Sequence, residues 1–120
     1  MRSMSERAPH VLLSDMIKAI ERVLSYTEGA TFDSFMGDSR TVDAVLRNLQ
    51  ILGEAARRVP RDVEAMAPEI EWAKIVRSRH ILVHDYFGVD HEIVWRIVEV
   101  HLPPMLTPLR ALQADLTPPS

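Results

Sequence analysis

One ten-residue stretch concentrates side chains that bind phosphate or move protons: Arg77-Ser78-Arg79-His80-Ile81-Leu82-Val83-His84-Asp85-Tyr86. Arginine is a bidentate phosphate ligand, and histidine titrates near neutral pH, which makes it the usual general acid or base. The sequence has no cysteine, and it lacks a glycine-rich phosphate loop, paired carboxylates and a Ser with a base at a motif spacing. An Arg could neutralise a scissile phosphate while a His accepts the proton of the attacking ribose 2′-hydroxyl. The stretch therefore indicates metal-free phosphodiester cleavage that leaves a cyclic phosphate.

Arg79 occupies an unusual position for a cation. On a helical wheel it lies near the middle of an apolar stripe that begins at Trp72 and ends at Phe87. A guanidinium there is costly unless it is paired or faces a polar site. A purely structural role stays open, in which Arg79 pairs with a carboxylate from another helix, such as Glu54.

The two histidines of the stretch allow a second chemistry. His80 and His84 are four residues apart, so they share one side of a helix, together with Arg77. This spacing also suits two metal ligands, with Asp85 or His91 as a third. The neighbouring arginines would repel a cation, and no Glu stands between the histidines as in a metalloprotease helix. We therefore expect neither a metal nor a cofactor, and the metal site remains the weaker alternative.

Helices must position these residues. The chain has 120 residues, 47% of them hydrophobic, and its apolar spacing is helical nearly throughout, without a convincing strand. The pattern predicts an all-α, single-domain bundle of about four main helices, with a core over about residues 9–114 and frayed termini. The expected main helices cover residues 9–28, 38 or 39 to 58, 71–87 and 90–101, with a short helix over 61–67 and a last segment, after Pro103 and Pro104, that reaches residue 114.

Two glycines and one aspartate define details of these helices. Gly29 is expected to stop the first helix, and Asp90 to cap the fourth. Gly53 lies within the apolar stripe of the second helix, where glycine costs about 1 kcal/mol relative to alanine. We expect another helix to approach closely at that position.

Charge and hydropathy limit the function classes. The net charge of −3 excludes a chain that coats nucleic acid through bulk positive charge, so any RNA contact requires a local basic cluster. No apolar run approaches the roughly 20 residues of a membrane helix. Residues 1–9 contain no apolar signal core, so we expect a cytoplasmic protein without a membrane partner.

The stretch resembles the signature of the HEPN superfamily, an Arg followed by Asn, Asp or His, then three residues, then His. The extension from His84 to Tyr86 is similar to the HepT branch. Similarity to that branch extends over about residues 11–112, through Tyr26-Thr27-Glu28-Gly29, Arg40-Thr41-Val42-Asp43-Ala44-Val45, Ile51-Leu52-Gly53-Glu54-Ala55-Ala56, Pro68-Glu69-Ile70-Glu71-Trp72 and Val83-His84-Asp85-Tyr86-Phe87-Gly88-Val89-Asp90.

The resemblance implies a metal-independent ribonuclease toxin of a toxin–antitoxin pair. It implies Arg79 and His84 as the catalytic pair and His80 as the supporting polar residue, and Arg77 is a candidate RNA phosphate ligand. The implied partner is a nucleotidyltransferase antitoxin that transfers AMP to the tyrosine at position 86. It also implies a homodimer in which two copies of the motif meet across a cleft. An alternative from another class is a non-catalytic helical module that only binds a nucleotidyltransferase.

Two observations fit a symmetric dimer. Ile81 and Ile51 lie opposite the main apolar stripes of their helices, which suggests a second apolar surface. On one ideal helix, residues 79 and 84 point about 140° apart. Either the helix is distorted there, or each protomer supplies part of the site.

Overall fold

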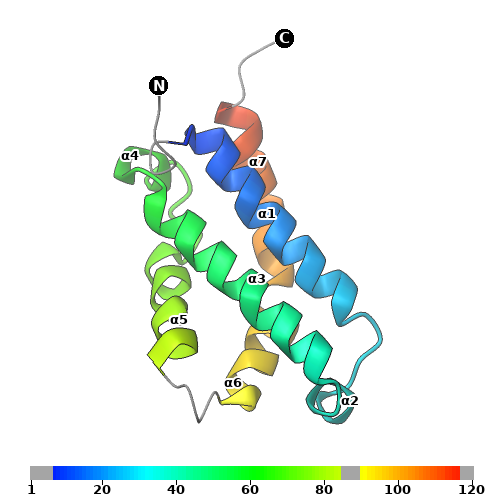
Figure 1. Cartoon of the computed structure of the whole chain (residues 1–120). Helices are drawn as coiled ribbons and strands as arrows, with labels where there is room; N and C mark the ends of the chain where they lie inside the picture. The colour runs from blue at the N-terminus through cyan, green and yellow to red at the C-terminus, as the bar shows by residue number, and fades with distance from the viewer. Residues whose placement is uncertain (1–6, 85–89, 117–120) are drawn as a thin grey trace.

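The computed structural model describes residues 7–84 and 90–116, and for residues 80–84 it describes the backbone alone. Two long antiparallel helices form the centre of the molecule: α1 (Pro9–Tyr26) and α3 (Ser39–Arg58) lie side by side (Figure 1). Helix α5 (Trp72–His84) packs against α3, and α7 (Leu106–Leu116) packs against α1. The predicted all-α bundle is confirmed.

Local sequence signals explain where α1 and α3 begin and end. Pro9 begins α1, where its missing N–H is tolerated. Helix α1 ends two residues earlier than predicted: the backbone N–H of Thr27 still donates to the carbonyl oxygen of Val23 (3.1 Å), and Gly29 then turns the chain with a φ of +73°. The side chain of Asp38 caps α3 by accepting from the backbone N–H of Thr41 (3.2 Å).

Short elements connect the long helices. Helix α2 (Phe32–Met36) begins with a reciprocal capping box between Thr31 and Ser34. Its Phe35 is buried against Trp95, with ring centroids 5.1 Å apart, which attaches α2 to α6 (His91–Arg96). Helix α4 (Arg61–Glu64) is shorter than the predicted 61–67.

The predicted helix over 90–101 is confirmed in extent, but its second half is a π-helix and not an α-helix. Asp90 caps α6 by accepting from the N–H of Glu92 (3.0 Å). The chain then widens into a π-turn, η2 (Ile97–His101), in which the N–H of Leu102 donates to the carbonyl oxygen of Ile97 (2.9 Å). The cause is the two following prolines, which cannot donate and would clash with carbonyls one turn back. They form the short 3₁₀ segment η3 (Pro103–Met105), after which α7 extends two residues beyond the predicted end.

The core lies between α1, α3 and α7 and includes Leu13, Ile20, Val45 and Leu109, each fully buried. Trp72, also buried, anchors the start of α5 because its indole N–H donates to the carbonyl oxygen of Ala67 (3.1 Å). Ile51, predicted as an exposed aliphatic, is instead half-buried and packs against the core. Within residues 7–84 and 90–116, no helix has the length and apolar character to cross a membrane.

Candidate active site

The backbone of Arg79 lies directly against α3 because Gly53, on α3, has no side chain. A Cβ atom added at Gly53 would lie 3.1 Å from the Cβ of Arg79 and 3.3 Å from the carbonyl oxygen of Ile75. Ordinary side chains would therefore separate the two helices at this point. The close approach predicted from Gly53 is confirmed, and it brings α5 to α3 at the residue that could do chemistry.

One helical position after Gly53, Glu54 binds three arginines. Its carboxylate pairs with Arg79 across the helix contact, with Arg57 at 2.6 Å and with Arg58 at 3.1 Å. Hydrogen bonding from Arg57, assisted by Arg79 and opposed by partial burial, lowers the pKa of Glu54 from its ordinary 4.5 to about 2. Glu54 is therefore a carboxylate at every physiological pH, and the Arg79–Glu54 pairing considered from the sequence is confirmed.

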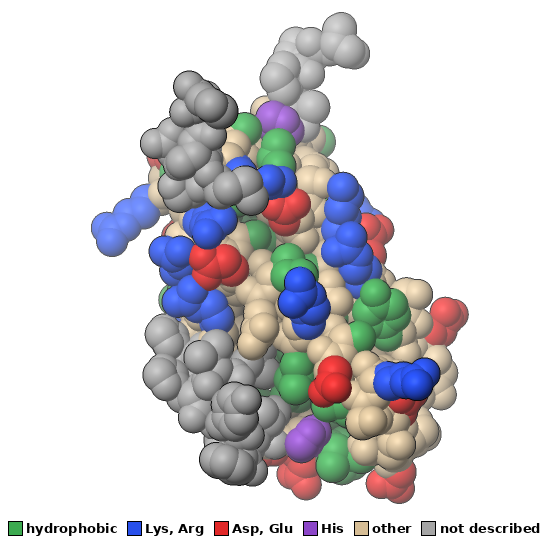
Figure 2. All heavy atoms as spheres, viewed as in Figure 1, with side chains coloured by type: hydrophobic (Ala, Val, Ile, Leu, Met, Phe, Trp, Pro, Cys, Tyr) green, Lys and Arg blue, Asp and Glu red, His purple; other side chains and the backbone are tan. Residues whose placement is uncertain are grey.

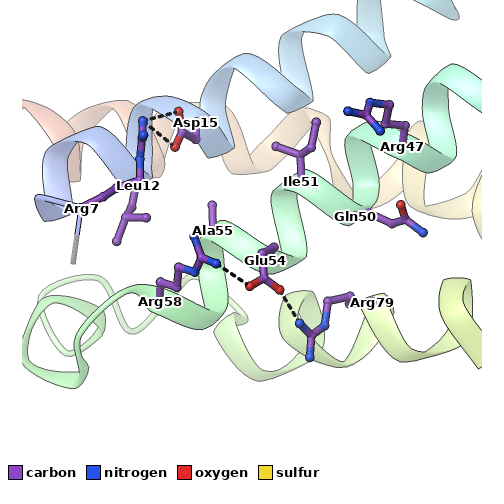
Figure 3. Close-up of a pocket in the computed structure, with 10 residues that line it drawn as sticks. All are labelled: Arg7, Leu12, Asp15, Arg47, Gln50, Ile51, Glu54, Ala55, Arg58 and Arg79. Carbon is purple, nitrogen blue, oxygen red and sulfur yellow. Dashed lines mark hydrogen bonds and ion pairs between the residues drawn. The ribbon is translucent and has the colours of Figure 1, made fainter. Parts of the chain in front are cut away.

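This pairing does not bury Arg79. Its side chain remains 27% exposed and lies at the edge of a hollow of about 660 Å³ between α1, α3 and α5 (Figure 3). Figure 3 also shows that the guanidinium of Arg79 points toward Glu54 from α5, while Arg58 reaches the same carboxylate from α3. The hollow is lined by Arg7, Leu12, Asp15, Arg47, Gln50, Ile51, Glu54, Ala55, Arg58 and Arg79.

The hollow is electropositive. Four arginines line it against two carboxylates, and one of those carboxylates, Asp15, is already paired with Arg7 at 3.2 Å. The side chain of Arg47 has no hydrogen bond or ion pair with another residue in the part of the chain that the structure describes. Lys and Arg side chains gather around acidic ones on the left of the face shown in Figure 2, where the C-terminal half of α3 lies in Figure 1. Arginines in excess of carboxylates make the hollow suitable for an anion such as an RNA phosphate.

Arg77 does not join this hollow. It is exposed and lines a different pocket, on the side of α5 that faces η2, together with Lys74, Ser78 and His101. The structure thus separates Arg77 and Arg79, the two arginines of the stretch, onto two sides of one helix.

The other residues of the motif are described only in part. The backbone of α5 is α-helical as far as His84, so positions 79 and 84 lie about 140° apart around its axis, and the helix is not distorted between them. The side chains of His80, Ile81 and His84 lie outside the described residues, and Tyr86 lies outside them entirely. The alternative metal site involves the same two histidines and is outside them as well.

Sequence reasoning missed the other arginines of the hollow. Four lining residues of α3 follow one another at intervals of four, three and four, so they share one face of this helix: Arg47, Ile51, Glu54 and Arg58. This spacing was visible in the sequence. Arg7 joins the set only through the packing of α1 on α3.

The all-α bundle is a fold of the HEPN type, and it places Arg79, the Arg of the Arg-x₄-His motif, beside the basic hollow. The model of the ribonuclease HepT-like family matches residues 16–112, and the chain belongs to that family. It is 40% identical over 91 residues (76% of this chain, 83% of the relative) to a Thermococcus cleftensis protein named "Probable ribonuclease HepT". It is 31% identical over 113 residues (94% of this chain, 93% of the relative) to a Methanocaldococcus jannaschii protein named "Putative RNase MJ0127". No solved structure gives a significant match. These relatives support a ribonuclease function.

Proposed function

We propose that this protein is a metal-independent endoribonuclease that cleaves single RNA strands at the edge of the basic hollow. The observation that carries the proposal is the placement of Arg79, which is fixed against α3, held by Glu54 and still 27% exposed beside Arg47 and Arg58. An arginine that served only to close the bundle would need neither that exposure nor the other cations.

The proposed chemistry is an internal transesterification. The ribose 2′-oxygen attacks the adjacent phosphorus, a new P–O2′ bond forms, and the P–O5′ bond breaks. The imidazole of His84 takes the 2′-hydroxyl proton, and the leaving 5′-oxygen takes a proton from the imidazolium or from water. Arg79 stabilises the charge that develops on the phosphoryl oxygens, a contribution of about 10²- to 10³-fold for one preorganised group. The product ends are a 2′,3′-cyclic phosphate and a 5′-hydroxyl.

The regular α5 helix supports a site shared between two protomers. Because positions 79 and 84 diverge by about 140° on an undistorted helix, one phosphate is reached more easily by Arg79 of one copy and His84 of the other. A symmetric homodimer, the commonest oligomer, would bring two such helices together. His80 is the supporting polar residue in this arrangement.

We further propose that the protein is the toxin of a pair whose antitoxin is a nucleotidyltransferase. The antitoxin would transfer AMP from ATP to the phenolic oxygen of Tyr86, so that a new P–O bond forms, pyrophosphate leaves and the phenolic proton passes to solvent. The attached AMP would place negative charge and bulk two residues from His84. Its phosphate would compete with RNA phosphate for arginine.

The test is RNA cleavage by purified protein in excess EDTA, compared among wild type, Arg79→Ala and Arg110→Ala. Arg110 is a matched control because it also pairs with a glutamate, Glu21 at 3.0 Å, but lies on α7 away from the hollow. We expect Arg79→Ala to lose at least about 10²-fold in rate and Arg110→Ala to stay near wild type. Cleavage that vanishes in EDTA and returns with zinc or manganese would contradict the proposal. A stable wild-type protein that never cleaves RNA would favour the binding module.

A further inference from the structure

A second pocket of about 250 Å³ opens on the other side of α5, between α5, α3 and the C-terminal segment. Its floor consists of buried core residues: Leu49 and Leu52 from α3, Ile75 from α5, and Leu102. Half-buried Ile97 and Met105 form a wall. The pocket is thus an aliphatic recess that is open to solvent.

The rim of this pocket is polar and mainly basic. Lys74, Arg77 and His101 stand on it, against one carboxylate, Glu71, which pairs with Lys74 at 2.6 Å. Arg77 is exposed and makes no ion pair with another described residue. A cation without an ion pair among the described residues, at the mouth of an apolar recess, favours a ligand with an apolar body and an anionic group.

The local backbone contributes to the shape of the recess. The π-turn carries two of the residues that line it, Ile97 at its first position and His101 at its last. Single π-turns within helical segments are frequent at functional sites. Here the turn exists because Pro103 and Pro104 prevent a regular helix, so the shape is encoded in the sequence.

We propose that this pocket binds one nucleobase of the RNA substrate, with the phosphate of the same nucleotide on Arg77. This inference rests on the proposed ribonuclease function. A base is flat and largely apolar on its faces, and its edge groups can reach Glu71, His101 or the Ser78 hydroxyl at the rim. Proteins that recognise single-stranded RNA take up such unstacked bases, whereas bases within a duplex are not accessible.

The position of the pocket gives its place on the substrate. Arg77 and Arg79 are two residues apart and line hollows on different sides of α5, so the pocket is separated from Arg79 by roughly one helix diameter, on the order of 10 Å. The bound base therefore belongs to a nucleotide that flanks the cleaved bond. The ribonuclease should accordingly prefer single-stranded RNA and show a base preference near the cut.

Methyl NMR of the full chain tests the proposal without requiring cleavage. With ¹³C-labelled methionine methyl groups, Met105 reports on the pocket, while the exposed Met36 and Met66 lie outside it. The probes are the four nucleoside 5′-monophosphates and, as a base-free control, ribose 5-phosphate. We expect a saturable shift of the Met105 signal with at least one nucleotide, little shift of Met36 or Met66, and no shift with ribose 5-phosphate.

Two variants complete the test. Arg77→Gln should weaken nucleotide binding about tenfold, the loss expected for one charged hydrogen bond, while Arg22→Gln on α1 should leave it unchanged. A Met105 signal that ignores all four nucleotides at millimolar concentration would overturn the inference, as would equal shifts with ribose 5-phosphate. If nucleotides shift Met105 but the protein never cleaves RNA, the proposed function fails while the nucleotide pocket stands.

Discussion

The contact at Gly53 gives the sharpest prediction about how the fold supports Arg79. The substitution Gly53→Ala adds one Cβ atom, 3.1 Å from the Cβ of Arg79 and 3.3 Å from a backbone carbonyl oxygen of α5. Neither neighbour is the flexible end of a side chain. The new atom therefore displaces the backbone of α5 by a few tenths of an ångström, and Arg79 moves with it.

Two opposing energies determine the stability of this variant. Alanine favours a helix interior by about 1 kcal/mol over glycine. Overpacking a tight contact costs about 1–3 kcal/mol. We expect a net destabilisation of about 1 kcal/mol. Even a small misplacement of Arg79 relative to the phosphate should reduce cleavage about tenfold or more, since displacements near 1 Å cost about 10²-fold.

The assay combines urea unfolding with initial rates of RNA cleavage at a temperature where the variant is fully folded. Gly37→Ala is the matched control, because its added Cβ would meet its nearest neighbour, the carbonyl oxygen of Asp33, at an ordinary 3.5 Å. The control should retain its activity. A Gly53→Ala protein about 1 kcal/mol more stable than wild type, with undiminished cleavage, would refute the claim that this contact positions Arg79.

Two further predictions concern Glu54 and Tyr86. The pKa of Glu54 is lowered in the fold from 4.5 to about 2, so its contribution to stability is complete above about pH 5 and is lost as the pH falls toward 2. The pKa difference sets an upper limit of about 3 kcal/mol on this contribution to stability, and solvent screening of a one-third exposed carboxylate reduces it to roughly 1–2 kcal/mol. Urea unfolding of Glu54→Gln should show that deficit at pH 7 and none near pH 2. A deficit independent of pH would contradict the ion-pair explanation. Tyr86→Phe should retain RNA cleavage but escape inhibition by the partner nucleotidyltransferase and ATP, and an AMP-sized mass increment that persists in this variant would place the modification elsewhere.

The sequence predicted those features of the fold that depend on local chemistry. Asp90 caps its helix, and Gly29 has the positive φ that favours glycine, because each acts on its own few residues. Gly53 and the Arg79–Glu54 pair were also predictable, since a glycine and a charge within apolar stripes each require a special neighbour.

Features that arise from packing between distant segments were not predictable in this way. Arg7 and Arg58 line the same hollow only because α1 lies against α3, and the nearness of Arg77 to η2 depends on how the C-terminal segment folds back. The apolar spacing of residues 90–101 is helical, so it predicts a regular helix. The π-turn forms instead because the prolines that follow do not permit regular helix geometry there. Wheel positions place Arg77 and Arg79 on different sides of α5, but they do not show which side faces a pocket.

The chemical identity of the new RNA ends tests the central claim most directly. Purified protein should be incubated with a defined single-stranded RNA in excess EDTA, and the fragments analysed by mass spectrometry. The proposed mechanism predicts a 2′,3′-cyclic phosphate on the upstream fragment and a 5′-hydroxyl on the downstream fragment, with no such fragments from Arg79→Ala. Fragments with 5′-phosphate and 3′-hydroxyl ends, or cleavage that requires an added divalent metal, would contradict the mechanism.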